Sequence, residues 1–180
     1  MNAEDSIMIE LARPQDAEEI QLVFYRTWLH TYPNAEIGVT SQDIEDRFKD
    51  KLTAEGVEKY KDRIKKQPDD QRMLVAKLNN KIVGACVLVR HTNNNELRAI
   101  YVLPEFQGKG VGMALWQQSL AFFDKEKDIV LEVATYNTKA IDFYTKLGFK
   151  DTGKRFRNER FRMKSGVVIP EMEMILKSGS

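Results

Sequence analysis

The 180-residue sequence has little of the chemistry that builds disulfides, metal centres or membrane anchors. Cys86 is the only cysteine, so no intrachain disulfide can form, which suits a reducing compartment. The two histidines, His30 and His91, have no ligand partner at metal spacing, so no metal is expected. No apolar run approaches the roughly 18 residues of a membrane span, and no secretion-type N-terminal segment is present. We therefore expect a cytoplasmic protein without a membrane partner.

Net charge is also scarce, because 28 basic residues against 27 acidic ones give +1 at neutral pH. Such a balance argues against a nucleic-acid partner. The uneven segment is 150–164, whose seven basic residues are Lys150, Lys154, Arg155, Arg157, Arg160, Arg162 and Lys164. A solvated hairpin face is its simplest interpretation. Contact with an acyl carrier's phosphate or an acidic partner stays open, and so does a homodimer.

The sequence has the composition of an ordinary globular protein and an informative glycine-rich turn at residues 107–112. With 42% hydrophobic and 31% charged residues, we expect a single domain over residues 1–180. The segment 96–102 has the pattern of a strand, and apolar residues recur at helical spacing from Val111 to about Lys125. The glycines of 107–112 therefore lie where a strand turns into a helix. Free N–H groups at a helix start bind phosphate, and glycine lets the backbone approach it.

Two familiar phosphate loops do not fit this turn. A P-loop needs Ser or Thr after its lysine, but Gly110 follows Lys109, and Leu103 stands where the first glycine belongs. A dinucleotide fingerprint fails because Met113 occupies its third glycine position. What remains over 107–112 is Gln-x-x-Gly-x-Gly, which does not identify a ligand by itself.

A second block makes the pattern specific. After a strand-like run at 129–134, residues 137–149 read Asn-x-x-Ala-x-x-Phe-Tyr-x-x-x-Gly-Phe. This block and the glycine turn, in this order with one helix and one strand between them, resemble the signature of the GNAT N-acetyltransferase superfamily. The resemblance covers about residues 7–176.

The order of the predicted elements is strand, helix, two helices, three strands, helix, strand, helix and two strands. It predicts an α/β fold with a mixed sheet and helices on both faces. The GNAT resemblance implies a mostly antiparallel sheet of about seven strands. It also implies a splayed central pair formed by the strands at 96–102 and 129–135.

Local patterns predict several details. Residues 41–67 are charged and amphipathic, which indicates one or two exposed helices. The ion pairs Glu45–Lys49 and Glu55–Lys59 are expected at i, i+4 spacing there. The Asn79–Asn80 dipeptide indicates a hairpin turn.

The resemblance implies acetyl-CoA as co-substrate, with its pyrophosphate on the glycine loop and its pantetheine beside the preceding strand. The implied cofactor-binding residues are Ile100, Tyr101, Val102, Gln107, Gly108, Lys109, Gly110, Val111, Gly112, Asn137 and Tyr144. For Asn137 a helix-capping role is equally compatible.

The chemistry needs an amine to lose a proton and a thiolate to leave. The resemblance gives Tyr144 the role of the acid that protonates the thiolate; the alternative is a core aromatic. It gives Glu96 the role of the base, often through water; the alternative is a strand-end carboxylate in solvent. Glu132 is a second carboxylate to consider. Cys86 fits a small buried side chain better than a nucleophile.

The resemblance implies a primary amine as the acceptor, and Trp28 and Tyr32 are predicted to bind it. Their aromatic spacing and the C-terminal run 169–174 resemble polyamine acetyltransferases of the superfamily. Carboxylates for a cationic amine are available at Asp43, Glu45 and Asp46. The alternative functions are acetylation of protein N-termini or lysines, and a non-catalytic acetyl-CoA sensor.

Overall fold

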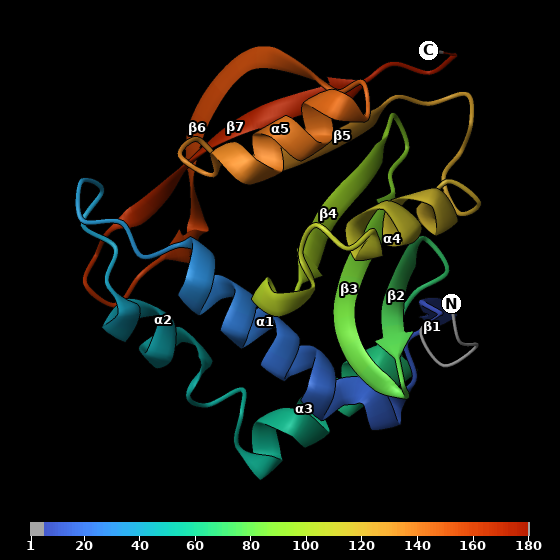
Figure 1. Ribbon diagram of the computed structural model, residues 1–180. Coiled ribbons are helices and arrows are strands. Elements are labelled where there is room, and N and C mark those ends of the chain that lie inside the picture. The colour runs from blue at the N-terminus through green and yellow to red at the C-terminus, as the bar shows by residue number, and fades with distance from the viewer. Residues whose placement is uncertain (1–5, 180) are drawn as a thin grey trace.

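The computed structural model describes residues 6–179, which form a seven-stranded mixed sheet in the order β1-β2-β3-β4-β5-β7-β6 (Figure 1). The strands are β1 Met8–Leu11, β2 Gln71–Leu78, β3 Lys81–Arg90, β4 Asn95–Val102, β5 Ile129–Ala134, β6 Lys150–Arg162 and β7 Val168–Leu176. The helices are α1 Ala17–Thr31, α2 Ser41–Phe48, α3 Ala54–Lys65, α4 Val111–Ser119 and α5 Thr138–Lys146, with 3-10 turns at Pro14–Asp16 and Pro104–Phe106. Neighbouring strands are antiparallel except β4 and β5, which run parallel. The α/β class and the mostly antiparallel sheet are confirmed.

The central strands β4 and β5 touch at one end only. Their paired residues are Asn95 with Ile129 and Glu96 with Val130, and beyond them the two strands diverge (Figure 1). The closed end is fixed by Asn95, which is fully buried. Its side-chain amide donates to the backbone oxygens of Asp124 and Lys127 at 2.8 and 3.1 Å. The predicted splay is confirmed.

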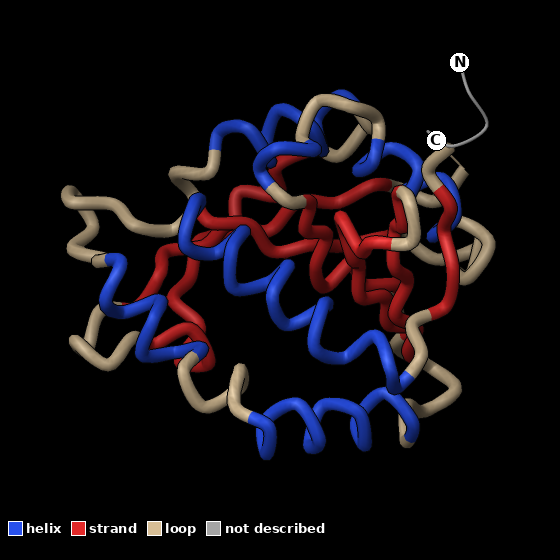
Figure 2. The backbone as a smooth tube through the Cα atoms, turned by 60° about the horizontal axis from the view of Figure 1, so that its bottom comes forward, coloured by secondary structure: helices blue, strands red, loops and turns tan. Residues whose placement is uncertain are grey.

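Helices cover both faces of the sheet. On one face, α4 and α5 pack on a core that includes Leu97, Leu115 and Phe149. On the other, α1 and α3 pack on a core around Ile20 and Val75, and Figure 2 shows α1 lying along this face. Each fully buried Leu or Ile contributes about 1.5–3 kcal/mol. The two cores therefore fasten the helices to opposite faces of the sheet.

Gly84 lets α4 lie close to β3. A Cβ at this position would stand 3.0 Å from the Tyr101 carbonyl oxygen and 3.1 Å from the side chain of Val111. Both contacts are tighter than an ordinary Cβ contact, so any larger residue would push the start of α4 away from β3. This close packing sets the distance of α4 from the sheet, and therefore also the position of the glycine turn that precedes α4.

The predicted local features are largely present. Asn79 and Asn80 have φ of 50° and 61° in the β2–β3 turn, as a hairpin requires. Lys59 pairs with Glu55 at 2.6 Å. The predicted Glu45–Lys49 pair is wrong, because the Lys49 ammonium lies 3.8 Å from Asp46, one residue nearer along the helix.

The helix after the glycine turn is shorter than expected. It was predicted to reach about Lys125, but α4 ends at Ser119. The segment that follows is held by Asn95, whose side-chain oxygen accepts from the Asp124 backbone N–H at 3.0 Å. Phe123 is buried in the core in this non-helical path. Contacts from a distant strand therefore outweigh the helical pattern of the sequence.

The basic segment 150–164 is largely neutralised by carboxylates. Five of its cations form ion pairs, namely Lys154–Glu173, Arg155–Asp151, Arg160–Glu132, Arg162–Glu159 and Lys164–Asp46. This arrangement favours the solvated-face interpretation. Within residues 6–179, no helix is long and apolar enough to cross a membrane, and no cluster of three His, Cys, Asp or Glu side chains is arranged for a metal ion.

Candidate functional site

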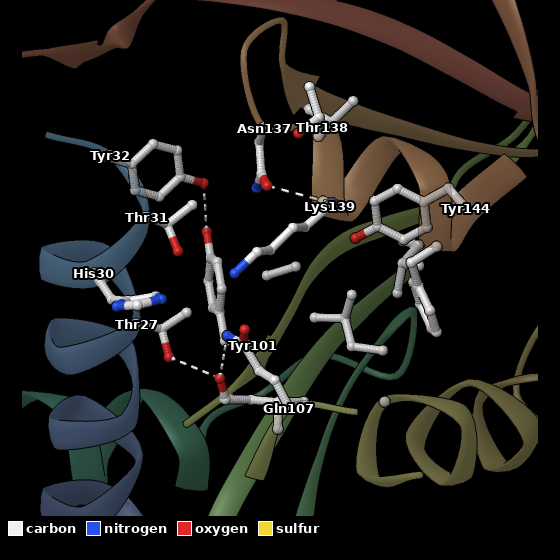
Figure 3. Close-up of a pocket in the computed structure, with 18 of the residues that line it drawn as sticks. Thr27, His30, Thr31, Tyr32, Tyr101, Gln107, Asn137, Thr138, Lys139 and Tyr144 are labelled. Carbon is white, nitrogen blue, oxygen red and sulfur yellow. Dashed lines mark hydrogen bonds between the residues drawn. The ribbon is translucent and has the colours of Figure 1, made fainter. Parts of the chain in front are cut away.

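A cavity of about 590 Å³ occupies the space between β4 and β5 (Figure 3). We call it the splay cavity. Its walls come from β4, the loop 107–112 and the starts of α4 and α5, together with the C-terminal end of α1. Of the predicted cofactor residues, nine line it: Ile100, Tyr101, Val102, Gln107, Gly108, Gly110, Gly112, Asn137 and Tyr144. The fold therefore brings two sequence-distant blocks to one hollow.

The other two predicted cofactor residues point elsewhere. The side chain of Val111 is buried in the core under α4. The Lys109 ammonium lies 5.4 Å from the centre of the Phe106 ring and does not line the cavity. Cavity-lining residues that sequence reasoning missed include Thr27 on α1 and Lys139 on α5, and Figure 3 shows the Lys139 side chain reaching into the hollow.

The glycine loop has the backbone of an anion cradle. Gly108 and Gly110 have φ of 74° and 85°, a left-handed conformation that favours glycine. No atom lies within 4 Å of where their Cβ atoms would be, so the space over the loop is open. The first intrahelical bond of α4 runs from Ala114 N–H to Gly110 at 2.9 Å. The N–H groups before Ala114 therefore lie at the positive end of the helix dipole and can donate to phosphate oxygens.

Tyr144 is positioned by both ends of α5. At the start, the Asn137 side chain accepts from the Ala140 N–H at 3.2 Å, so the predicted capping role is present. At the end, Gly148 has φ of 95°, and Phe149 N–H donates to the Tyr144 carbonyl at 3.0 Å. This is a Schellman cap, with the hydrophobic contact that accompanies it, because the Tyr144 and Phe149 rings lie 5.8 Å apart.

The Tyr144 hydroxyl points into the splay cavity, while the ring is part of the core (Figure 3). The residue is 7% exposed. Burial raises the pKa of Tyr144 well above its ordinary value, so the phenol keeps its proton at any working pH. Both sequence-based interpretations of Tyr144 therefore apply, since the ring packs and the hydroxyl is available as a donor.

Glu96 does not line the splay cavity. Its carboxylate accepts from His91 at 2.8 Å and from Arg98 at 2.8 and 3.1 Å. Burial raises the pKa of Glu96, but the hydrogen bonds from Arg98 and His91 outweigh it and hold the pKa below its usual range. A carboxylate held in this way is a weak proton acceptor. Glu132 does line the cavity, and its Oε2 accepts from Arg160 at 2.7 Å.

Glu171 on β7 is a carboxyl group that sequence reasoning missed as a proton acceptor. It is 5% exposed, and its Oε2 has no hydrogen-bond partner among residues 6–179. Burial and the negative charge of Glu132 raise the pKa of Glu171 to about 7. Glu171 lines neither the splay cavity nor the cavity on the other side of β4, but its charge acts on the hydroxyls of Tyr32 and Tyr101, which both line the splay cavity. The alternation of side chains along β7 could have predicted the face of the sheet on which Glu171 lies. It could not have predicted that the side chain is buried.

A second cavity, of about 870 Å³, lies on the other side of β4 between α1, α3 and the sheet. We call it the lateral cavity. It shares Arg98, Ala99 and Tyr101 with the splay cavity, so the two meet along β4. Of the predicted acceptor residues, Trp28 lines the lateral cavity and Tyr32 lines the splay cavity. The Tyr32 and Tyr101 hydroxyls, 3.5 Å apart, stand at the junction.

The carboxylates predicted to attract a cationic amine do not line either cavity. Asp43 is a structural residue, because it accepts hydrogen bonds from Thr40 and from the Ser165 N–H. Burial raises its pKa, but these bonds outweigh it and lower the pKa of Asp43 to about 2. Asp46 pairs with Lys49 and with a lysine of the basic segment. That expectation was wrong because these side chains serve the cap and surface of α2.

Comparison with known proteins identifies relatives of this chain. The profile of the acetyltransferase (GNAT) family matches residues 40–149. An uncharacterised N-acetyltransferase of Methanocaldococcus jannaschii is 29% identical over 133 residues, covering 63% of this chain and 59% of that protein. One from Mycobacterium tuberculosis is 35% identical over 86 residues, covering 46% and 55%. The chain thus spans less than two thirds of these relatives.

Solved structures share the fold over nearly the full length of the chain. PaiA N-acetyltransferase from Thermoplasma acidophilum, solved in complex with coenzyme A, has a TM-score of 0.74 at 24% identity and covers 96% of this chain and 99% of that one. An acetyltransferase from Salmonella typhimurium, solved with acetyl-CoA, has a TM-score of 0.62 at 21% identity and covers 98% and 96%.

Proposed function

Because this chain belongs to the acetyltransferase (GNAT) family, we propose that it transfers an acetyl group from acetyl-CoA to a primary amine. The observation that carries the proposal is the pair of cavities that meet along β4. One has an anion cradle at its end and the Tyr144 hydroxyl in its wall. The other gives a second substrate its own approach. Transfer between two substrates needs such an arrangement, because the reacting atoms must meet while both substrates are bound.

The residues of the splay cavity suit coenzyme A. The N–H groups of the loop 107–112 would hold its pyrophosphate. Beyond Glu96, the edge of β4 that faces β5 has no paired strand among residues 6–179, so its peptide groups can bond an extended arm such as pantetheine. Acetyl-CoA supplies a thioester already activated toward attack. Tyr144 would donate its hydroxyl hydrogen toward the sulfur as the carbon–sulfur bond breaks.

Transfer by direct attack is favoured over an acyl-enzyme. Cys86 is fully buried and lines neither cavity. Burial raises the pKa of the Cys86 thiol to about 12, so it is not a thiolate at neutral pH. In the proposed reaction the amine nitrogen bonds to the acetyl carbon, the thiolate leaves, and the amine gives up a proton.

Neither Glu171 nor Glu96 lines the splay cavity or the lateral cavity, so the proton must reach either carboxylate through a hydroxyl or a water. We assign it to Glu171, because Glu171 has an unpartnered oxygen and Glu96 is saturated by Arg98 and His91. With a folded pKa of about 7, Glu171 is a base above that pH. We expect kcat/KM of the wild type to rise with pH up to about 7. Glu171→Gln should lose this limb and about 10²-fold or more of kcat/KM.

The same variant should lose activity but gain stability relative to the wild type at high pH. The folded pKa of about 7 lies above the roughly 4.3 of an unfolded glutamate, so the native state loses stability as pH rises between those values. Denaturant unfolding should show Glu171→Gln gaining on the order of 3 kcal/mol on the wild type between pH 4 and pH 8. An unchanged pH–rate limb in the variant would remove Glu171 from the mechanism.

The principal alternative is a sensor that binds acetyl-CoA without catalysis. An open acceptor side favours the enzyme, and the lateral cavity is open rather than filled by side chains. Purified protein with acetyl-CoA and a panel of polyamines, small amines and peptides should release free thiol only when an accepted amine is present. Tight acetyl-CoA binding with no thiol release across that panel would instead establish the sensor.

A further inference from the structure

The lateral cavity carries an excess of positive charge. Its lining includes six cations and two carboxylates: Arg47, Lys51, Lys59, Arg63, Arg98 and Arg160 against Asp50 and Glu55. Three of the cations are neutralised in the pairs Lys59–Glu55, Arg98–Glu96 and Arg160–Glu132. Within residues 6–179, no carboxylate lies within ion-pair distance of Arg47, Lys51 or Arg63. These three, which we call the cation group, are left without a counter-charge.

The Arg47 guanidinium is held in place by its neighbours but has a hydrogen-bond donor without a partner. Its guanidinium lies 4.7 Å from the centre of the Trp28 ring and 5.5 Å from that of Phe161. One terminal nitrogen donates to the Arg160 carbonyl at 2.8 Å, whereas the buried Nε has no acceptor among the described residues. A buried donor without an acceptor is costly, and an anionic oxygen is the acceptor it matches best.

The other two members stand beside Arg47. The Lys51 ammonium lies 4.5 Å from the centre of the Phe48 ring, and the Arg63 guanidinium 5.9 Å from that of Tyr60. Partial burial and the charges of Arg47 and Arg63 lower the pKa of Lys51 to about 8. The charges of Arg47 and Arg63 therefore disfavour the charge on Lys51, and no carboxylate of residues 6–179 is ion-paired with any of the three. A bound anion would favour that charge.

We propose that the acceptor is a primary amine that also carries a carboxylate or phosphate group, and that the cation group binds this anion while the amine points to β4. This inference rests on the proposed acetyl transfer and names its substrate class. The aromatic walls of Trp28, Phe48 and Tyr60 leave room for an apolar body between the two polar ends. A polyamine is itself cationic and would be repelled by the cation group, so the polyamine resemblance does not extend to this cavity.

The test compares acceptors that differ only in the anion. L-phenylalanine is paired with L-phenylalanine amide, and O-phosphoethanolamine with ethanolamine; spermidine represents the polycations. We expect the anionic member of one or both pairs to exceed its neutral partner at least tenfold in kcat/KM, and spermidine to be the poorest acceptor. The pair with the larger ratio distinguishes a carboxylate from a phosphate.

Charge variants assign the preference to the cation group. Arg47→Met and Lys51→Met keep much of each side chain's length and remove its charge, and each should reduce the anionic-to-neutral ratio about 10- to 100-fold. Arg47→Lys should retain part of the preference for the anionic acceptor, because lysine keeps the charge but lacks the planar fork of arginine. The matched control is Lys61→Met on α3, which does not line the cavity and should leave the ratio unchanged.

Binding keeps this inference separable from the proposed function. Calorimetry with L-phenylalanine, O-phosphoethanolamine and spermidine, on free and coenzyme A-loaded protein, should show uptake of an anionic amine that Arg47→Met weakens. Binding with no turnover of any amine would overturn acetyl transfer and leave the anion site standing. Turnover that favours spermidine, or a ratio indifferent to Arg47 and Lys51, would overturn the anion site and leave acetyl transfer standing.

Discussion

Replacing Tyr144 with phenylalanine is expected to lower kcat by about 10²–10⁴-fold, the range typical of one proton-transferring group. The substitution removes a single oxygen from the wall of the splay cavity and keeps the ring contacts with Phe143 and Phe149, whose centres lie 5.5 and 5.8 Å away. The melting temperature and the affinity for acetyl-CoA should therefore stay close to those of the wild type. Steady-state kinetics, thermal unfolding and calorimetry measure the three quantities.

Tyr136→Phe is the matched control, because it also removes a hydroxyl from the same cavity. That hydroxyl donates to the Tyr32 carbonyl at 3.0 Å, so its loss should cost about 1 kcal/mol of stability and less than tenfold in kcat. Tyr144→Ala, by contrast, should destabilise by about 3–5 kcal/mol through the cavity it leaves. A Tyr144→Phe enzyme with normal kcat would show that the residue only packs and that solvent protonates the thiolate.

The raised pKa of Tyr144 refines how the hydroxyl acts. A phenol that holds its proton more tightly than a thiol, with its ordinary pKa near 8.5, does not surrender it fully in the ground state. Its contribution must come as charge develops on the leaving sulfur, when a hydrogen bond from a desolvated donor is strongest. The activity should consequently show no pH limb from Tyr144 anywhere near neutrality, which leaves the limb near 7 to Glu171.

The parts of the site that sequence could predict are those set by local chain geometry. The loop 107–112 was found because glycines between a strand and a helix have a local meaning, and nine predicted residues do line one cavity. Asn137 was read as a helix cap for the same reason, and its side chain does cap α5. The splay of β4 from β5 came from family resemblance and not from the residues alone.

What sequence could not supply is burial and long-range pairing. Glu96 looked like a free carboxylate, but Arg98 and His91 reach it only once β4 and its preceding turn have formed. Glu171 looked like an ordinary strand residue, and its burial follows only from the assembled fold. The charge of the lateral cavity depends on which cations meet a carboxylate in the folded chain, as Arg160 of β6 meets Glu132 of β5. A residue count cannot reveal this.

Gly110→Asp is expected to lower the affinity for acetyl-CoA by 10²-fold or more. The new carboxylate would stand in the open space over the loop, where no protein atom lies within 4 Å, and would repel the phosphate at the helix start. Gly112→Ala should have a smaller effect, because its Cβ would meet the Phe143 ring at 3.5 Å, an ordinary contact, and adds no charge. Calorimetry on each folded variant measures the loss.

Strain must be separated from charge in this test, since Gly110 has φ of 85° and any L-residue there costs about 1–2 kcal/mol. Gly153→Asp is the control. Gly153 has φ of 83°, also with no atom within 4 Å of its Cβ position, and lies on β6 away from the splay cavity. The two variants should therefore destabilise the fold to a similar extent, while only Gly110→Asp loses acetyl-CoA. Equal affinity in the two would mean that the pyrophosphate does not sit on the loop 107–112, and the assignment of the splay cavity to coenzyme A would fall with it.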